Sequence, residues 1–551
     1  FLHHQEFFPT LPKKLTEEQQ QALDKICASL HKREFQTHLL YGVTGSGKTE
    51  VYLQAMAFAL SLGLNVLFLV PEISLTLQTL ERIRTRFKEE VAVLHHRLSE
   101  GEKRDLWHKT LKGEVRILIG ARSALFSPLP SLGLIVVDEE HESAYKQQEE
   151  MPCYHARDVA VMRAKFNKCS IILGSATPTL ESFTNAQKGK YILSKLHKRA
   201  AGASLPSSFL VDMEKEKEKH KKGVIFSDLL LRKIEERLSK GEQTLIFLNR
   251  RGFHTSALCK QCQKPLVCPH CSLNLSLHKK EAYLECHLCH YKLSPPPKEC
   301  PSCNSAALMH YKGIGTEQVE KSLANLFPEA RLLRLDADTT SQKLAQDKIL
   351  KLFRSGKADI LVGTQMIAKG LHFPSLTLVG VLQADSSLQI PDFRSSENSF
   401  QILTQVAGRA GRGPIPGEVI FQSYLPSHPV LLQAKEQNFE RFFEQEIEER
   451  KLFSYPPFTH LVRLILSGKD LQKTEQEAQS LFLFVRSILP SNYIIYPPSP
   501  CGHAKIKDYF RLHILIKGNS SQKISSLLSL QPFPLKHTHL IIDVDPLSTY
   551  F

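Results

Sequence analysis

One glycine-rich segment near the amino terminus constrains the fold of this chain more than any other feature. It follows a short apolar run, precedes a helix-length segment and consists of Gly42, Val43, Thr44, Gly45, Ser46, Gly47, Lys48 and Thr49. Strand, glycine-rich loop and helix in that order form a phosphate-binding P-loop, in which backbone N–H groups surround phosphate oxygens. We therefore predict an ATP site, with Lys48 neutralising the β and γ phosphates and the Thr49 hydroxyl binding Mg²⁺.

Short apolar runs alternate with helix-length amphipathic segments along most of the chain, a pattern typical of parallel sheets covered by helices. The runs lie at 39–41, 66–70, 117–119, 134–137 and 171–173, then at 244–248, 331–335, 360–362, 376–382 and 418–422. They predict two α/β lobes. The charged run 214–222 contains no apolar residue, and we expect it to be a solvated linker or loop between the halves.

The domain organisation follows from these runs and from the position of the cysteines. We expect a lead-in at 1–14, a first lobe at 15–200, a second lobe at 201–258 and 304–430, a cysteine-rich insertion at 259–303 and an α+β domain at 431–551. The insertion is polar and shows no sheet periodicity, which predicts a metal core of its own. Residue 1 is Phe rather than Met, which predicts that the chain begins inside a longer polypeptide.

A second phosphate-site motif, Asp138-Glu139-Glu140-His141, follows the apolar run 134–137. The carboxyl ends of parallel strands meet at one sheet edge, so these carboxylates are expected beside the P-loop. Asp138 is suited to hold Mg²⁺ through water, and Glu139 to orient and deprotonate the attacking water. An exposed acidic turn is the alternative interpretation.

A third motif, QVAGRAGR at 405–412, lies far along the chain in the second lobe. Its two arginines, Arg409 and Arg412, are three residues apart, so we expect them on one helix face. From there they could reach a phosphate between the lobes as arginine fingers. The alternative is a solvated arginine pair.

Eight of the 12 cysteines form four C-x-x-C pairs, which in a reducing compartment indicate metal binding. Two pairs supply one tetrahedral S₄ site, so we expect two structural Zn²⁺ ions. The four C-x-x-C pairs can be combined into two sites in three ways. The ribbon-like spacing of the two inner pairs favours a nested arrangement, in which the inner pairs share one site and the outer pairs share the other. The main alternative to zinc is an iron–sulfur cluster. The nested sites would be Cys268, Cys271, Cys286 and Cys289, and around them Cys259, Cys262, Cys300 and Cys303.

The charge balance favours a polyanionic partner. The chain has 71 Lys and Arg against 56 Asp and Glu, a net charge of +15. We expect the partner to be nucleic acid, because a basic protein that binds it releases condensed counterions. The alternatives are an anionic membrane surface and a solvated basic surface with no dedicated partner. No apolar run approaches the roughly 20 residues of a membrane span, and the first residues have no signal-peptide pattern, so we expect a cytoplasmic protein.

The order of these motifs resembles the superfamily 2 helicases and, within them, the bacterial replication-restart helicases of the primosomal protein N′ (PriA) family. The superfamily motifs are GVTGSGKT at 42–49, DEEH at 138–141, SAT at 175–177, GTQ at 363–365 and QVAGRAGR at 405–412. The finer likeness rests on LTEEQ at 15–19, GARS at 120–123, YHARD at 154–158, NRRG at 249–252, GIGTE at 313–317 and DVDP at 543–546.

The resemblance implies a monomeric, bacterial, ATP-dependent helicase that moves 3′ to 5′ on single-stranded and forked DNA. It would remodel stalled or collapsed forks and start primosome assembly, with primosome proteins and single-stranded DNA-binding protein as partners. The same nesting of the two zinc sites is implied. The family's fork-recognition domains precede the helicase core, whereas only a short lead-in precedes Leu15 here, so fork recognition by those parts is not carried over.

The resemblance also assigns roles to individual residues. Gln19 would contact adenine, and Gln405 would act with the arginines in catalysis. Ser175 and Thr177 would couple hydrolysis to lobe movement, while Arg122, Thr364 and Lys369 would touch the DNA backbone. Residues 145–155 resemble the family's aromatic-rich loop, in which Tyr154 would stack on single-stranded DNA.

Two other functions stay open at the level of the sequence. One is a zinc scaffold with a vestigial nucleotide site, against which the intact Lys48, Thr49, Asp138, Glu139 and Arg412 speak. The other is an RNA helicase, whose class the cysteine insertion does not resemble.

Overall fold

The computed structural model describes most of the chain, and every structural statement below refers to that part. The residues outside it are 1–9, 72–76, 88–90, 96–97, 149, 201–203, 222–223, 250–255, 259–260, 263–265, 272–273, 279–282, 287–288, 290, 296, 298, 302, 306–309, 313–314, 337–344, 368–372, 414, 531–532 and 551. Two expected site residues, Cys259 and Lys369, fall in these gaps.

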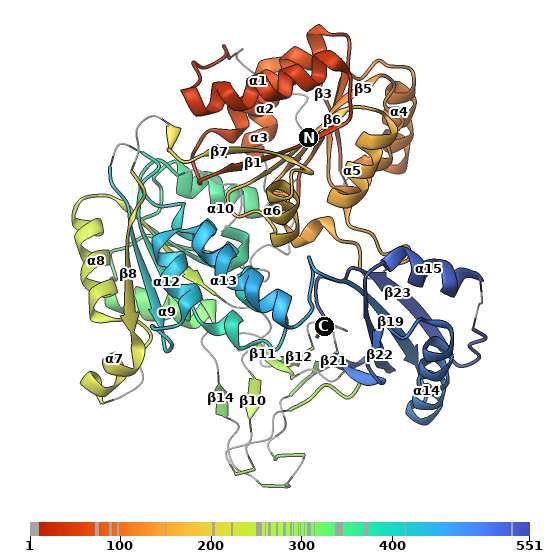
Figure 1. Ribbon diagram of the computed structural model, residues 1–551. Coiled ribbons are helices and arrows are strands. Elements are labelled where there is room, and N and C mark those ends of the chain that lie inside the picture. The colour runs from red at the N-terminus through yellow and green to blue at the C-terminus, as the bar shows by residue number, and fades with distance from the viewer. Residues whose placement is uncertain are drawn as a thin grey trace.

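The first lobe is built on a sheet whose described strands, seven in number, all run parallel (Figure 1). Their order across the sheet is β3-β4-β2-β5-β6-β1-β7. The strands are β1 (Gln36–Gly42), β2 (Asn65–Leu69), β3 (Val91–Leu94), β4 (Ile117–Gly120), β5 (Leu132–Asp138), β6 (Ser170–Ser175) and β7 (Ile192–Leu196). The sequence indicated the five inner strands. It missed two edge strands that are only partly buried: β3, which has only four residues, and β7, whose apolar pattern is interrupted by Ser194 and Lys195.

Helices cover both faces of this sheet because successive strand residues point to opposite sides. Leu40 packs in the core with α1 and α2, whereas its neighbour Leu39 packs in the other core with α5 and α6. The helices are α1 (Glu17–Lys32), α2 (Lys48–Ser61), α3 (Leu77–Phe87), α4 (Glu100–Leu111), α5 (Ala156–Phe166) and α6 (Leu180–Gln187), with short 3₁₀ turns η3 (Arg122–Phe126) and η4 (Ser143–Tyr145).

The second lobe repeats this architecture with a parallel sheet in the order β15-β16-β9-β17-β18-β8. Its strands are β8 (Ser207–Asp212), β9 (Gln243–Leu248), β15 (Leu332–Leu335), β16 (Ile360–Gly363), β17 (Leu376–Leu382) and β18 (Glu418–Ser423). Its helical segments are α7 (Met213–His220), α8 (Asp228–Ser239), α9 (Thr316–Leu326), η6 (Gln365–Ile367), α10 (Ala345–Arg354), η7 (Ser386–Gln389) and α11 (Ser395–Ala407). The prediction of two parallel-sheet lobes is confirmed.

The charged run at 214–222 was expected to be a linker or loop between the halves, and that expectation is wrong. Its residues up to His220 form α7, and the preceding strand β8 already pairs with β18 in the second sheet. The Asp212 carboxylate caps the helix by accepting from the amides of Glu214 and Lys215. Acidic residues in the first turn and basic ones in the last suit the helix dipole, so this helix forms without an apolar face.

The cysteine-rich insertion separates β9 from β15 and projects from the bottom of the molecule in Figure 1. It contains a small antiparallel sheet, although the sequence showed no sheet periodicity. Strands of two or three residues are too short to show an alternation. They are β10 (Ser256–Leu258), β11 (Ser276–His278), β12 (Tyr283–Glu285), β13 (Lys292–Leu293) and β14 (His310–Lys312).

The carboxyl-terminal domain is an antiparallel sheet with helices, as the sequence indicated, and lies on the right of Figure 1. Its elements are β19 (His460–Gly468), α14 (Leu471–Ile488), β20 (Ile494–Ile495), β21 (Ser499–Ile506), β22 (Tyr509–Gly518), α15 (Ser521–Leu530) and β23 (Thr538–Val544). Its core is separate from those of the lobes.

Two helices before this domain, α12 (Pro429–Glu436) and α13 (Phe439–Leu452), join the two lobes instead. Phe439 packs edge-on against Phe183 of α6, with ring centroids 5.1 Å apart. Phe442 stacks on Phe400 of α11 at 4.3 Å. The lobes therefore share one continuous apolar core, centred on α13. Among the helices described here, none is both long and apolar enough to cross a membrane.

Candidate active site

Three strands of the first sheet end at the same edge, and each carries one of the expected motifs. β5, β6 and β1 are neighbours, with Asp138 opposite Gly174 and Tyr41 opposite Ser175 in the register. The P-loop follows β1, the acidic motif begins at the end of β5, and Ser175 ends β6. The fold thus brings together motifs that lie far apart in the chain.

The P-loop is a tight turn whose backbone carbonyl oxygens accept hydrogen bonds from nearby side chains. Gly45 and Gly47 have φ of +86° and +82°, which residues with a side chain rarely adopt. The Lys48 ammonium donates to the Gly42 carbonyl oxygen at 2.7 Å. The buried Gln19 side chain donates to the Ser46 carbonyl oxygen at 2.7 Å. Thr49 follows Lys48 in the first turn of α2.

The acidic motif is held by two tyrosines: Tyr52, which the sequence analysis did not single out, and Tyr145, the first residue of the expected aromatic-rich loop. The Tyr52 hydroxyl donates to Asp138 Oδ1 at 3.2 Å, and the Tyr145 hydroxyl donates to the Asp138 carbonyl oxygen at 2.7 Å. Burial and the neighbouring Glu139 raise the pKa of Asp138 to about 7, against the opposing effect of Lys48. A divalent cation bound here would offset the unfavourable free energy of keeping the buried Asp138 carboxylate charged. The packing of aromatic residues on a P-loop helix has no sequence motif that would have revealed it.

The end of β6 connects the acidic motif to the second lobe. Ser175 Oγ lies 2.7 Å from His141 Nδ1 and accepts from the Thr177 amide at 2.9 Å. His141 Nδ1 in turn lies 3.7 Å from Glu139 Oε2. The Gln401 side chain of α11 donates to the Thr177 carbonyl oxygen at 3.4 Å. A chain of contacts therefore runs from Glu139 through Ser175 to the second lobe.

The two arginines were expected on one helix face, and this is wrong. α11 ends at Ala407, and Arg409 and Arg412 lie in the turn that follows. Gly411, at φ +63°, allows the turn because a Cβ there would lie 2.4 Å from the Gly417 amide nitrogen. The turn faces the P-loop, since a Cβ on Gly408 would lie 2.6 Å from Cβ of Thr44.

Electrostatics place the arginines close to the phosphate site. Burial lowers the pKa of Arg409 to about 10, with Glu139 opposing that shift. Burial lowers the pKa of Lys48 too; Glu139 and Asp138 oppose this shift, and the nearby arginines reinforce it. The site thus gathers three positively charged side chains, those of Lys48, Arg409 and Arg412, which would attract a polyphosphate. Gln405 is also buried, and its Nε2 has no hydrogen-bond partner among the described residues.

Arg199, just after β7, fastens this turn to the P-loop and was missed by the sequence analysis. Its guanidinium donates to the carbonyl oxygens of Ala410 and Gly411 at 3.3 and 3.1 Å. The amide of the next residue, Ala200, donates to the Gly45 carbonyl oxygen at 2.9 Å. An isolated arginine carries no motif, so only the fold reveals this contact.

A buried ion-pair network lies beside the site and spans both lobes. Glu140 of the acidic motif pairs with Arg157 at 3.1 Å and accepts from the Thr179 amide at 2.7 Å. Across the interface, Glu181 pairs with Arg394. Glu397 connects Arg394 to Arg450 of α13, at 2.8 and 3.0 Å respectively. Buried charges of this kind are costly unless paired, so the network fixes the relative position of the lobes.

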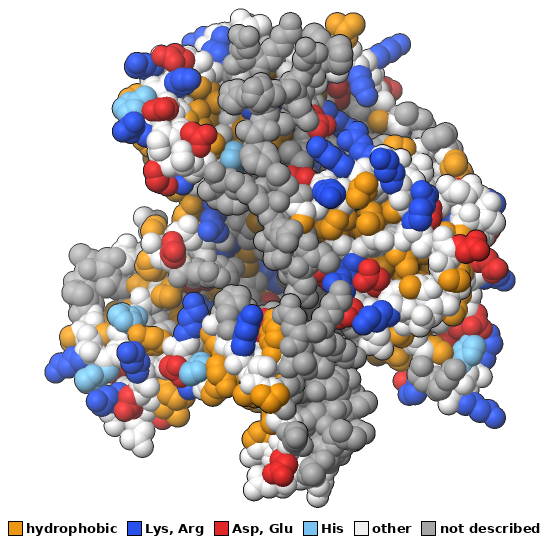
Figure 2. Space-filling model, turned by 180° about the vertical axis from the view of Figure 1, so that it is seen from behind, with side chains coloured by type: hydrophobic (Ala, Val, Ile, Leu, Met, Phe, Trp, Pro, Cys, Tyr) orange, Lys and Arg blue, Asp and Glu red, His pale blue; other side chains and the backbone are white. Residues whose placement is uncertain are grey.

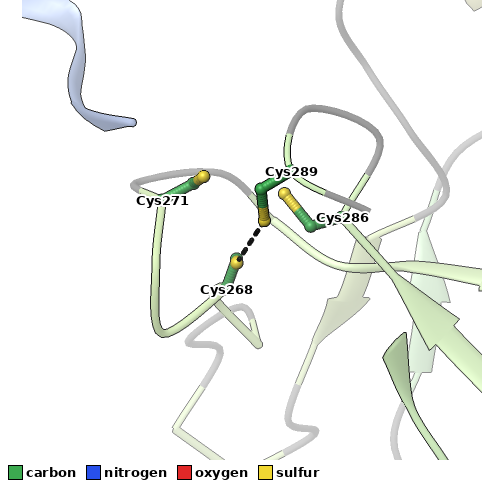
Figure 3. A group of neighbouring side chains, drawn as sticks. All are labelled: Cys268, Cys271, Cys286 and Cys289. Carbon is green, nitrogen blue, oxygen red and sulfur yellow. Dashed lines mark hydrogen bonds between the residues drawn. The ribbon is translucent and has the colours of Figure 1, made fainter. Parts of the chain in front are cut away.

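The inner cysteine pairs form one cluster, as the nested arrangement requires. The sulfur atoms of Cys268, Cys271, Cys286 and Cys289 lie within 4.8 Å of one another and converge on a common point (Figure 3). Cys262, Cys300 and Cys303 form a second group, whose three sulfur atoms also lie within 4.8 Å of one another. Its expected fourth member, Cys259, lies outside the described residues. Both groups have the chemistry of a thiolate metal site, and the cysteines are not paired as disulfides.

The inner cluster also contacts the carboxyl-terminal domain. The amide of Lys507, in the turn between β21 and β22, donates to Cys271 Sγ at 3.4 Å. Asp508 donates its amide to the His270 carbonyl oxygen and accepts from the His270 ring, at 2.9 and 2.7 Å. Lys505 donates to the Pro269 carbonyl oxygen at 2.9 Å. The basic side chain of Lys505 is therefore used in an internal contact.

The expected DNA-contacting residues lie on both lobes. The Arg122 guanidinium, in η3, donates to the Lys146 carbonyl oxygen at 3.0 Å. Tyr154 packs edge-on against the exposed Phe126, with centroids 5.3 Å apart, a partner the sequence analysis missed. Thr364 follows β16 and is half-buried. Lysine and arginine side chains also gather on the upper right of the face seen in Figure 2.

Comparison with known proteins places this site in a class. Family models match at residues 16–186 (DEAD/DEAH box helicase), 307–414 (helicase conserved C-terminal domain) and 451–547 (primosomal protein N C-terminal domain). Two parallel-sheet lobes with a P-loop facing an arginine turn, matched by two helicase models, define an ATP-dependent helicase.

Curated relatives narrow that class. The replication restart protein PriA of Chlamydia pneumoniae is 50% identical over 99% of this chain and 73% of that protein. PriA of Bacillus subtilis (strain 168) is 45% identical over 98% of this chain and 67% of that protein. The chain belongs to the PriA family of replication restart proteins. Among solved structures, RecG bound to a three-way DNA junction is similar over 80% of this chain and 47% of the RecG chain. The identity is 18% and the TM-score 0.49, so we draw no conclusion about function from this similarity.

Proposed function

We propose that this helicase moves 3′ to 5′ along one DNA strand, remodels stalled or collapsed replication forks and starts primosome assembly. Its partners would be single-stranded and forked DNA, primosome proteins and single-stranded DNA-binding protein, and it would act as a monomer in the bacterial cytoplasm. The observation that carries the proposal is the P-loop facing an arginine turn across a lobe interface, in a chain of the PriA family. The direction and the partners rest on the family resemblance.

Hydrolysis would use groups from both lobes. Lys48 and the amides of 42–49 bind the phosphates, Gln19 contacts adenine, and Thr49 and Asp138 hold Mg²⁺. A bound Mg²⁺ supplies charge neutralisation on the β and γ phosphates. Glu139 orients the attacking water and accepts its proton. Arg409, Arg412 and the Gln405 amide, whose Nε2 has no hydrogen-bond partner among the described residues, stabilise negative charge that develops on the transferred phosphoryl group.

Coupling to DNA would run through the first lobe and across the interface. Arg122, Thr364 and Lys369 contact the DNA backbone, which positions a strand without reading its sequence. Tyr154, supported by Phe126, stacks on a base. Ser175 and Thr177 transmit the change because they join His141 to Gln401 of the second lobe.

The two cysteine groups would each hold one structural Zn²⁺. The four sulfurs of the inner cluster are close enough to ligate a single ion, and Cys259 would complete the outer site. Thiol modification should release about two zinc ions per chain, the number that eight thiolates in S₄ sites imply. A brown protein that absorbs visible light would instead indicate an iron–sulfur cluster.

The test of the function is the rate of ATP hydrolysis with single-stranded, duplex and forked DNA, with RNA of the same sequence as the control. We expect strong stimulation by single-stranded and forked DNA. Unwinding of forks with one strand protected at its 3′ or 5′ end tests the direction. Lys48→Ala should abolish both hydrolysis and unwinding. An unimpaired Lys48→Ala variant would overturn the motor function, and equal stimulation by RNA would overturn the preference for DNA.

A further inference from the structure

The carboxyl-terminal domain contacts the first lobe through a buried ion pair with Lys146, which follows the acidic motif and the short turn η4. Lys146 Nζ lies 2.7 Å from Asp543 Oδ1 of β23, and the two side chains are only 1% and 5% exposed. The same ammonium donates to the Val544 and Asp545 carbonyl oxygens at 2.6 and 3.3 Å. All these acceptors belong to the DVDP segment, to which the hydrolysis chemistry assigns no role.

Lys146 lies at the base of a hairpin that carries Tyr154. Lys146 and His155 pair as an antiparallel bridge, and the Gln147 amide donates to the Tyr154 carbonyl oxygen at 2.8 Å. The Gln147 side chain donates to the Pro152 carbonyl oxygen at 3.1 Å. Because the Lys146 side chain fixes one strand of this base, it also fixes where Tyr154 meets Phe126.

Lys146 also stands between the acidic motif and a candidate DNA contact. Its neighbour Tyr145 is buried and donates its hydroxyl to the Asp138 carbonyl oxygen at 2.7 Å. The Lys146 carbonyl oxygen accepts from the Arg122 guanidinium at 3.0 Å. A shift of this one residue would therefore move the magnesium motif, Arg122 and the hairpin together.

A buried ammonium at such a junction needs full compensation. Removing one partner of a buried pair leaves an uncompensated charge, so the remaining side chain moves or draws in water. The Asp543 carboxylate is thus the group that keeps Lys146 pointing into the carboxyl-terminal domain.

We propose that Asp543 is a positioning residue for DNA-stimulated ATP hydrolysis. Through its ion pair with Lys146, the carboxyl-terminal domain holds the hairpin and Arg122 in the arrangement that passes the DNA signal to the acidic motif. This inference deepens the proposed function and rests on it. The domain would be part of the coupling device in addition to any docking role.

The experiment measures the ratio of DNA-stimulated to basal ATP hydrolysis in the full chain, with poly(dT) as the DNA. We expect Asp543→Asn and Lys146→Met each to lower this ratio by about tenfold, within the range of coupling changes seen along such networks. The double variant should fall no further than either single one, because both remove the same pair. The ratio is insensitive to a loss of folded protein, which reduces both rates alike.

The matched control is Ser548→Ala. Ser548 belongs to the same domain but donates to Asp392 of the second lobe, at 2.7 Å. The ratio of DNA-stimulated to basal hydrolysis in Ser548→Ala should equal that of the wild type. A wild-type ratio in Asp543→Asn, or an equal fall in Ser548→Ala, would overturn the proposal. If Asp543→Asn does not fold, Lys146→Met with Asp543→Leu replaces it, because apolar replacement of a buried pair is often close to neutral. An unstimulated wild type would contradict the proposed function itself.

Discussion

The Tyr52 hydroxyl donates a 3.2 Å hydrogen bond to Asp138 Oδ1, which joins the helix of the P-loop to the end of the neighbouring acidic strand. Tyr52 reaches Asp138 by passing over Gly174, where a Cβ would lie 1.6 Å from the hydroxyl oxygen. Three strand ends are therefore interlocked: the P-loop on β1, the acidic motif on β5 and the glycine on β6. Lys48 and Asp138 keep their relative position through this contact.

Tyr52→Phe removes the hydrogen bond and keeps the ring. We expect more Mg²⁺ to be needed for half-maximal ATP hydrolysis, by about tenfold, since a hydrogen bond to a charged group contributes about 1.5–3 kcal/mol. A Mg²⁺ titration of the hydrolysis rate measures this. Tyr493→Phe, in the core of the carboxyl-terminal domain, is the control and should behave as the wild type. An unchanged Mg²⁺ requirement in Tyr52→Phe would show that the hydroxyl does not position Asp138.

Gly174→Ala tests the same contact by steric conflict. The added methyl group overlaps the Tyr52 hydroxyl, so we expect a loss of about 1–3 kcal/mol in the free energy of unfolding. Denaturant unfolding measures it. Gly101→Ala serves as the control, because a Cβ there meets open space on α4. If Gly174→Ala is as stable as the wild type, Tyr52 is not confined as the structure indicates.

Arg409→Lys and Arg412→Lys should each slow ATP hydrolysis by about a thousandfold, the low end of the contribution of an arginine finger. A lysine retains the charge but cannot donate two parallel hydrogen bonds to a phosphoryl group. Nucleotide affinity, measured with a fluorescent ATP analogue, should change much less than the rate. Arg441→Lys, on an exposed part of α13, should leave the rate intact. Equal losses of affinity and rate would assign the arginines to binding alone.

The ion pair between Glu181 and Arg394 predicts a pH-dependent stability. Burial alone would raise the pKa of Glu181, but Arg394 lowers it to about 2, below the ordinary 4.5. A depressed carboxyl pKa stabilises the fold above the unfolded value, and this contribution is lost as the pH falls from 4.5 towards 2. Melting temperatures at pH 5 and pH 3 should therefore differ less in Glu181→Gln than in the wild type. Identical shifts would show that this pair does not contribute.

Metal removal should loosen the carboxyl-terminal domain at one point. The Lys507 amide donates to Cys271 Sγ, so loss of the proposed zinc ion frees that sulfur and weakens the contact. We expect hydrogen exchange around Lys507 to accelerate by about tenfold after chelation. The Asp545 amide, bonded to the Leu461 carbonyl oxygen at 2.8 Å in the same domain, is the internal control. Unchanged exchange at Lys507 would show that the turn docks without the metal cluster.

Much of the site could be predicted where its chemistry depends on local spacing. The P-loop is a continuous segment whose glycines permit positive φ, and Asp138 ends a continuous apolar strand. Parallel strands place such ends at one sheet edge. By contrast, the arginine motif was predicted in the wrong local structure. Spacing of three residues suits a helix, but α11 ends at Ala407 with Gly408 as its C-cap, so both arginines lie beyond the helix.

The sequence by itself determined the two parallel-sheet lobes, the acidic motif and the cysteine groups, because residues close together in the chain carry each of them. Only the tertiary structure decided that Thr44 meets Gly408, that Arg199 holds the arginine turn and that Lys146 pairs with Asp543. Those contacts join residues far apart in the chain. Their formation depends on how whole elements pack, and on the need of each buried charge for a partner that no local pattern specifies.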